Sequence, residues 1–129
     1  MKKQFYILTI CIACIVLFSG SAFKTKSKTV YAYVTSLEVL KSVPRNVYVD
    51  LYTNIVEVRC NHGHNEVARQ FLEYYNAEAG TSKRELVANT TSAWLYNSYD
   101  EAFAKRRADM AKYSTKEKRI LKNFYVTCE

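Results

Sequence analysis

The two histidines of the chain, His62 and His64, lie in a short segment that also holds Cys60 and Glu66. Imidazole, thiolate and carboxylate groups at this spacing can bind zinc or copper. A metal site needs more than two ligands, however, and polar residues also gather in ordinary turns that lead into helices. His62 and His64 are therefore a candidate metal pair, with a plain surface turn as the alternative. No other segment offers a complete metal or catalytic motif, so we predict no cofactor and no catalytic residue.

The cysteines favour a disulfide over a reactive thiol. Cys11 and Cys14 fall in an apolar N-terminal stretch, which leaves Cys60 and Cys128 for the folded part of the chain. In an oxidising compartment two such cysteines form one intramolecular bond. A bond to Cys128 would remove Cys60 as a nucleophile, and the remaining alternative is two separate buried thiols. We also expect the strands that end at Cys60 and Cys128 to be parallel neighbours.

The N-terminus has the composition of a secretory signal. Two lysines at positions 2 and 3 precede the apolar stretch of residues 5–18, and small residues follow at 19–22. A retained membrane anchor would need about 20 apolar residues, and lipid modification of a cysteine is a further alternative. We predict a signal peptide over residues 1–22, a basic N-terminal segment over 23–28 and one domain over 29–129. The protein is then periplasmic or secreted, with no stable membrane span after cleavage.

The formal net charge of the whole chain is +7. Cleavage of the predicted signal would remove the lysines at positions 2 and 3, so the positive charge of the mature protein is modest. Lysines and arginines of the second half are interleaved with acids, which is typical of solvated helix faces. Together with an export signal, this argues against nucleic acid as a partner.

Alternating side chains predict strands over residues 29–35, 47–52, 55–60, 93–96 and 120–128. In each strand aliphatic residues occupy one face, and in most of them tyrosine or tryptophan occupies the other. Residues 65–79 and 98–113 instead have helical spacing. Gly80 would end the first helix, and Ser98 with Glu101 forms a capping box for the second. The second helix would turn Tyr99, Phe103 and Met110 toward the sheet.

This succession predicts an α+β fold. We expect a two-layer sandwich in which a mixed sheet carries both helices on its aliphatic face.

Two resemblances rest on short motifs. The mature chain resembles small exported bacterial proteins of unknown function in its Val-Tyr-Ala-Tyr strand at residues 30–33, its Val-Tyr pair at 47–48, its Arg-Gln-Phe-Leu helix core at 69–72 and its Met-Ala-Lys-Tyr helix end at 110–113. That resemblance implies a fold and an exported location but no activity. Residues 95–102 are also similar to the strand-to-helix step of sporulation-related repeat domains, which implies binding to peptidoglycan. The extra early strand and the missing glycine-rich strand ends depart from that family.

The aromatic face of the sheet is the candidate binding surface. With both helices on the aliphatic side, the other face would expose a group of aromatic residues: Tyr31, Tyr33, Tyr48, Tyr52, Trp94, Tyr96 and Tyr125. A monomer seldom leaves such a patch uncovered unless a partner docks on it. Tyrosines are also simply good strand residues, which is the alternative. We predict a non-enzymatic binding domain for a protein partner, with a cell-wall glycan as the alternative ligand and a metal-binding or hydrolytic protein using His62 and His64 as a third possibility.

Overall fold

The computed structural model describes residues 27–112 and 116–129. The predicted signal peptide therefore lies outside the described residues. The elements follow in the order β1 (Val30–Leu40), β2 (Val47–Thr53), β3 (Val56–Val58), α2 (His64–Tyr74), η1 (Tyr75–Ala79), β4 (Arg84–Leu86), β5 (Ser92–Tyr96), α3 (Tyr99–Lys112) and β6 (Lys118–Leu121). In the described part of the chain, no helix is both long enough and apolar enough to cross a membrane.

Strand β1 is the centre of the sheet. It pairs antiparallel with β2, β3, β4 and β5, and β6 joins the far side of β2 in parallel orientation. The predicted α+β fold with a mixed sheet and two helices is thus confirmed. The short strand β4 was not predicted, because its residues Arg84–Leu86 show no alternation of aliphatic and polar side chains.

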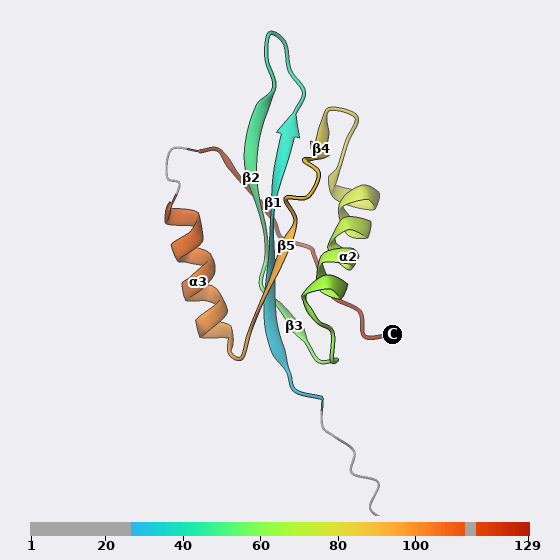
Figure 1. Cartoon of the computed structure of the whole chain (residues 1–129), viewed down its shortest axis with the longest axis vertical. Helices are drawn as coiled ribbons and strands as arrows, with labels where there is room; N and C mark the ends of the chain where they lie inside the picture. Colours follow the sequence, from blue (N-terminus) through green and yellow to red (C-terminus); the bar gives the residue numbers. More distant parts are fainter. Residues whose placement is uncertain (1–26, 113–115) are drawn as a thin grey trace, which may run out of the picture.

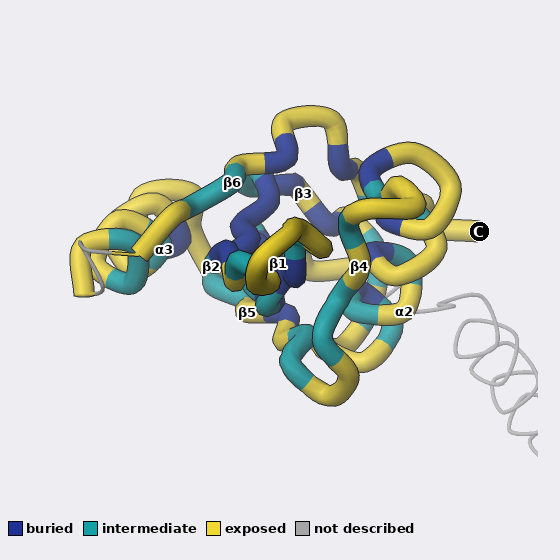
Figure 2. The backbone as a smooth tube through the Cα atoms, turned by 90° about the horizontal axis from the view of Figure 1, so that it is seen from above, coloured by how far each residue is buried: buried dark blue, intermediate teal, exposed yellow. Residues whose placement is uncertain are grey.

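The two helices lie on opposite faces of the sheet, not on one face as we expected. Figure 1 and the end-on view in Figure 2 both place α3 on one side of β1 and α2 on the other. The reason is visible in β1, where the consecutive residues Ala32, Tyr33 and Val34 are all buried. Since successive side chains point to opposite faces, both faces of this strand need cover.

The larger core lies between the sheet and α2. Val67 and Phe71 of the helix pack on aliphatic side chains of β1, β2 and β3, and Phe124 closes the cluster with its ring edge-on to that of Phe71. This is the aliphatic face that the alternating pattern predicted. Each buried side chain of this size stabilises the fold by roughly 1.5–3 kcal/mol before its ordering entropy is counted.

The end of the chain differs from the prediction. The strand expected over residues 120–128 stops at Leu121, and residues 122–129 continue without ladder pairing. The side-chain amide of Asn54 donates to the carbonyl oxygen of Phe124 and accepts from its N–H, at 3.0 and 3.1 Å. Side-chain contacts therefore hold this segment, and it needs no neighbouring strand.

The disulfide between Cys60 and Cys128 is present, with the two Cα atoms 5.5 Å apart. The prediction about its strands was wrong. Strand β3, which precedes Cys60, pairs with β1, whereas the parallel pair of the sheet is β2 with β6. Both cysteines lie beyond the ends of strands, where the backbone is free to bring the sulfur atoms together. Cys60 is half-buried and Cys128 is exposed. Disulfides are typical of proteins in oxidising compartments.

Candidate functional site

Helix α3 covers part of the aromatic face, and the aromatic residues fall into three groups. Tyr33 and Tyr52 are buried beneath α3. The Tyr33 hydroxyl donates to Asp109 Oδ2 at 2.6 Å, and the Tyr52 hydroxyl donates to the Asp109 carbonyl oxygen at 3.4 Å. Burial, followed by the hydrogen bond to the Asp109 carboxylate, strongly raises the pKa of Tyr33. These two tyrosines therefore attach α3 to the sheet, and the expectation that they face solvent was wrong.

Three of the remaining aromatic residues are distributed around the molecule. Tyr31 packs edge-on against Tyr99 at the start of α3, with ring centroids 6.0 Å apart. Tyr48 is exposed on β2 beside the β1–β2 turn. Tyr125 is exposed in the C-terminal segment and lines a hollow formed with α2, so it lies apart from the others. The structure does not unite these three residues in one surface.

Trp94 and Tyr96 of β5 do share a site. Together with Thr35 and Tyr52 they form the sheet side of a groove of about 650 Å³, whose other wall is α3. We call this hollow the β5–α3 groove. Its volume falls in the range of pockets that bind small ligands or single side chains of a partner.

The ring of Trp94 is the most prominent exposed group of the β5–α3 groove. It remains 43% exposed, although it stands on a strand directly opposite the buried Tyr33. The indole N–H donates to the Thr35 hydroxyl at 3.0 Å, which fixes the orientation of the ring. Tyr96 stacks on Tyr33 nearly in parallel, with centroids 5.9 Å apart. The groove thus presents aromatic surface that is already ordered before any ligand arrives.

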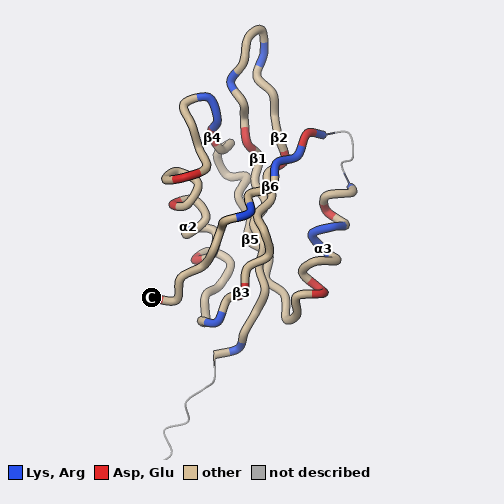
Figure 3. Tube along the Cα trace, turned by 180° about the vertical axis from the view of Figure 1, so that it is seen from behind, with Lys and Arg blue, Asp and Glu red and all other residues tan. Residues whose placement is uncertain are grey.

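One flank of α3 supplies the charged wall of the groove. Lys105, Asp109 and Lys112 recur at intervals of four and three residues, so they share one side of the helix. Figure 3 shows basic residues in the middle turns and at the end of α3, and acidic residues at its start and again beyond the middle turns. The carboxylate of Asp109 is engaged by Tyr33. That carboxylate keeps its charge, so two lysines and one aspartate leave the wall with one net positive charge.

The remaining face of α3 departs from the expected pattern. Ala102 is the one buried residue among those that the structure describes in this helix, while Tyr99 and Phe103 stack on each other and stay about half exposed. Arg106 faces the sheet, where burial lowers the pKa of its guanidinium. The hydroxyl groups of the tyrosines on the sheet need hydrogen-bond partners. Helix α3 is therefore oriented with Asp109, rather than Phe103, toward the sheet. Of the predicted capping box, the hydrogen bond from the Glu101 N–H to the Ser98 hydroxyl is present, at 3.2 Å.

The two histidines of the candidate metal pair are directed to separate partners. His62 Nε2 lies 2.9 Å from the carbonyl oxygen of Thr127, and His64 Nδ1 lies 2.7 Å from that of Ala93. Because these carbonyl groups belong to the C-terminal segment and to β5, the rings do not converge on one point. His64 also lines the β5–α3 groove.

The sequence did not predict a buried cluster of charged side chains around Glu38. The Glu38 carboxylate, which is fully buried, accepts from Arg84 at 2.8 Å, from Arg119 at 2.6 Å and from the Tyr75 hydroxyl at 2.7 Å. These partners come from β4, β6 and η1. In the sequence, the sign of this cluster is Glu38, an acidic residue within an apolar strand. Its partners could not be identified, because they are distant in the chain. Arg84 and Tyr75 also line a hollow of about 700 Å³ beside α2.

The groups that line the β5–α3 groove form no hydrogen-bonded pair of nucleophile and base among the described residues. Asp109 and His64 are both engaged by other parts of the fold, and the lysines stand on the wall.

No protein-family model, no curated protein and no solved structure matches this chain.

Proposed function

We propose that this protein is an exported, non-enzymatic binding domain that holds its partner in the β5–α3 groove. The observation that carries this proposal is Trp94, a large ring that is exposed, fixed by its hydrogen bond to Thr35 and set in the wall of a hollow. The exposed ring keeps a large apolar area in contact with water. A docking partner would bury that area, which is favourable in free energy. Tryptophan and tyrosine are also the residues in which binding energy concentrates at interfaces.

The preferred partner is a protein segment that carries acidic and apolar side chains. Lys105 would face its carboxylates, while Trp94 and Tyr96 would contact its apolar groups. A second hollow of about 260 Å³ shares Thr35 and Tyr52 with the groove, and it includes Lys116. The two hollows adjoin, so an extended segment fits the surface better than a single small molecule does.

A cell-wall glycan is the second candidate ligand. The face of a fixed indole ring can stack on a sugar ring, and the hydroxyl and ammonium groups nearby can bind sugar hydroxyls or carboxylates. Export is supported by the signal-like composition of residues 1–22 and by the disulfide.

The test compares Trp94→Ala with Tyr125→Ala, because both rings are exposed but only Trp94 lies in the groove. The immobilised proteins would be incubated with solubilised envelope proteins and, separately, with purified peptidoglycan. We expect Trp94→Ala to reduce recovery of a specific protein partner about tenfold or more. Tyr125→Ala should bind as the wild type does, and circular dichroism should show that both variants are folded.

Each result distinguishes between the candidates. Retention on peptidoglycan that depends on Trp94 would replace the protein partner by the glycan. Equal binding of wild type and Trp94→Ala to every ligand would show that the groove is not the binding site and would overturn the proposal.

A further inference from the structure

The disulfide and His62 form a cluster that the β5–α3 groove does not use. Cys60 Sγ, Cys128 Sγ and a ring nitrogen of His62 all lie within 4.8 Å of one another, beyond the end of β3. We propose that the reduced form of the protein binds one zinc ion through Cys60, His62 and Cys128, so that the disulfide and the metal site are alternative states of the same three residues. This proposal is independent of the groove.

The ligand set is one that zinc accepts. Two thiolates and one imidazole leave a fourth tetrahedral position for water. Zinc ligand atoms lie about 2.0–2.3 Å from the metal, so small side-chain rotations can bring three atoms already within 4.8 Å of one another around one ion. His64 is excluded from this set, because its ring nitrogens do not belong to the group of ligand atoms within 4.8 Å of one another.

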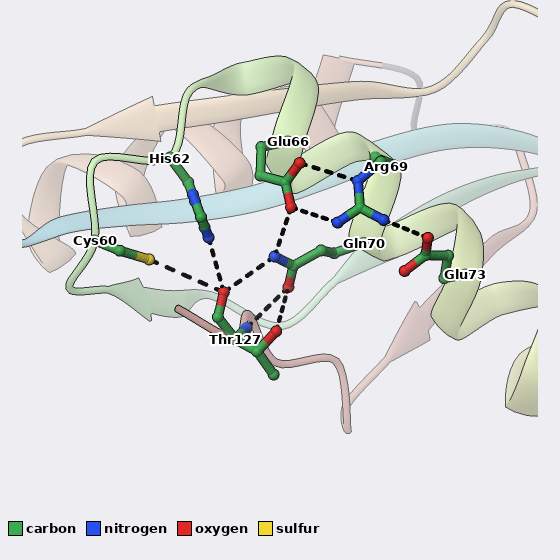
Figure 4. Close-up of polar contacts among 7 residues, drawn as sticks. All are labelled: Cys60, His62, Glu66, Arg69, Gln70, Glu73 and Thr127. Atoms are coloured by element: carbon green, nitrogen blue, oxygen red, sulfur yellow. Dashed lines mark hydrogen bonds and ion pairs between the residues drawn. The ribbon is translucent and has the colours of Figure 1, made fainter. Parts of the chain in front are cut away.

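The surrounding contacts would hold the three residues in place after the disulfide is opened. Figure 4 shows Cys60, His62 and Gln70 converging on the carbonyl oxygen of Thr127, the residue that precedes Cys128. His62 Nε2 lies 2.9 Å from that oxygen, and the Gln70 side-chain amide donates to it at 3.0 Å. Gln70 Oε1 also accepts the Thr127 N–H at 2.8 Å. Helix α2 therefore positions the C-terminal segment through Gln70, without help from the disulfide.

Burial of Phe124 supports the same conclusion. Its side chain lies in the core against Phe71, and its backbone is paired with the Asn54 side chain. Reduction leaves these contacts intact, so the Cys128 thiol stays close to Cys60. A preformed site of this kind binds metal with a smaller ordering penalty than an unfolded chain does.

The chemistry is a two-electron exchange followed by metal binding. A dithiol reductant attacks the exposed disulfide, the S–S bond breaks, and the reductant leaves as its own disulfide while Cys60 and Cys128 become thiols. Zinc then displaces one proton from each thiol, and neutral His62 supplies the third ligand. A disulfide oxidant reverses the exchange: it accepts the two electrons and leaves as a dithiol, the bond between Cys60 and Cys128 forms again, and the ion is released.

The experiment measures zinc bound per chain by native mass spectrometry. The protein would be reduced with a phosphine, freed of reductant without oxygen, and mixed with zinc. We expect one zinc ion per reduced chain and none per oxidised chain. His62→Ala should weaken zinc binding about tenfold or more, while the matched variant His64→Ala should bind zinc as the wild type does.

The proposal stays testable even if reduction unfolds the chain. In that case, zinc should restore the near-ultraviolet circular dichroism of the wild type and of His64→Ala, but not that of His62→Ala. Absence of stoichiometric zinc on the reduced wild type, or equal binding by the wild type and His62→Ala, would overturn the proposal.

Discussion

Glu38 is a fully buried carboxylate that bridges two arginines from separate strands. Removing a charge from water is unfavourable, and Arg84, Arg119 and Tyr75 together offset that penalty by donating hydrogen bonds to both carboxylate oxygen atoms. The arginines keep about a third of their side-chain exposure, so the cluster stands at the boundary between core and solvent. It therefore ties β1, β4, β6 and η1 together at one point.

We expect Glu38→Gln to lower the free energy of unfolding by about 3 kcal/mol, because two partly buried arginines would lose their counter-charge. The measurement is urea denaturation followed by circular dichroism. The matched control is Glu85→Gln, which removes an exposed ion pair with Lys41 and should lower stability by less than about 1 kcal/mol. Equal effects of the two substitutions would show that the Glu38 cluster contributes nothing beyond a surface pair.

At the scale of elements, α3 is attached to the sheet mainly by polar contacts. Ala102 is its buried residue, and the hydrogen bonds from Tyr33 and Tyr52 to Asp109 supplement this small apolar contact. Helix α2 differs, since Val67 and Phe71 place it in the main core. The attachment of α3 should therefore depend on the protonation of Tyr33, whereas that of α2 should not.

We expect stability to fall as the pH rises above 10.0, the ordinary pKa of tyrosine. The pKa of Tyr33 is raised in the folded state, by burial first, so folding favours the neutral phenol. That contribution is complete below the pKa of the unfolded chain and is lost above it, because the unfolded chain then ionises first. Burial raises the pKa of Tyr75 as well, and it acts in the same direction.

The measurement is the urea midpoint on either side of that pH. Tyr33→Phe should flatten the alkaline decline but not abolish it, because Tyr75 remains, and Tyr125→Phe should leave the decline unchanged. An identical pH profile for Tyr33→Phe and the wild type would contradict the assignment.

At the scale of the whole molecule, the disulfide joins residues 68 positions apart. It links the end of β3 to a C-terminal segment that has no ladder pairing. The segment nevertheless completes the main core through Phe124. The bond thus fixes the last part of the chain onto a core that the preceding strands and α2 have formed.

Reduction in metal-free buffer should lower the free energy of unfolding by up to about 4 kcal/mol, the loop-closure entropy that a bond over this separation removes from the unfolded chain. Denaturation curves with and without reductant measure this difference. The double variant Cys60→Ser with Cys128→Ser should have the stability of the reduced wild type and should not respond to reductant. A wild type whose stability is unchanged by reduction would show that the bond does not constrain the unfolded chain.

The sequence alone predicted the elements whose signals are local. Alternation and helical spacing predicted β1, β2, β5, α2 and α3, because each pattern is complete within a few turns or pleats. The Cys60–Cys128 pair was also predicted, because apart from the two in the N-terminal apolar stretch these are the cysteines of the chain. Trp94 was named as a surface aromatic residue and lies exposed in a groove.

Only the tertiary structure decided which face each helix covers. The strands carry aliphatic side chains on one face and aromatic ones on the other, and either face gains free energy when water is excluded from it. The alternation of side chains therefore shows that each strand has two distinct faces, but it does not show which face stays exposed to solvent. The structure buries Tyr33 under α3 and leaves Trp94, its neighbour across the strands, in the groove wall. That difference arises because α3 is too narrow to cover the whole aromatic face, and it follows from packing between segments far apart in the chain.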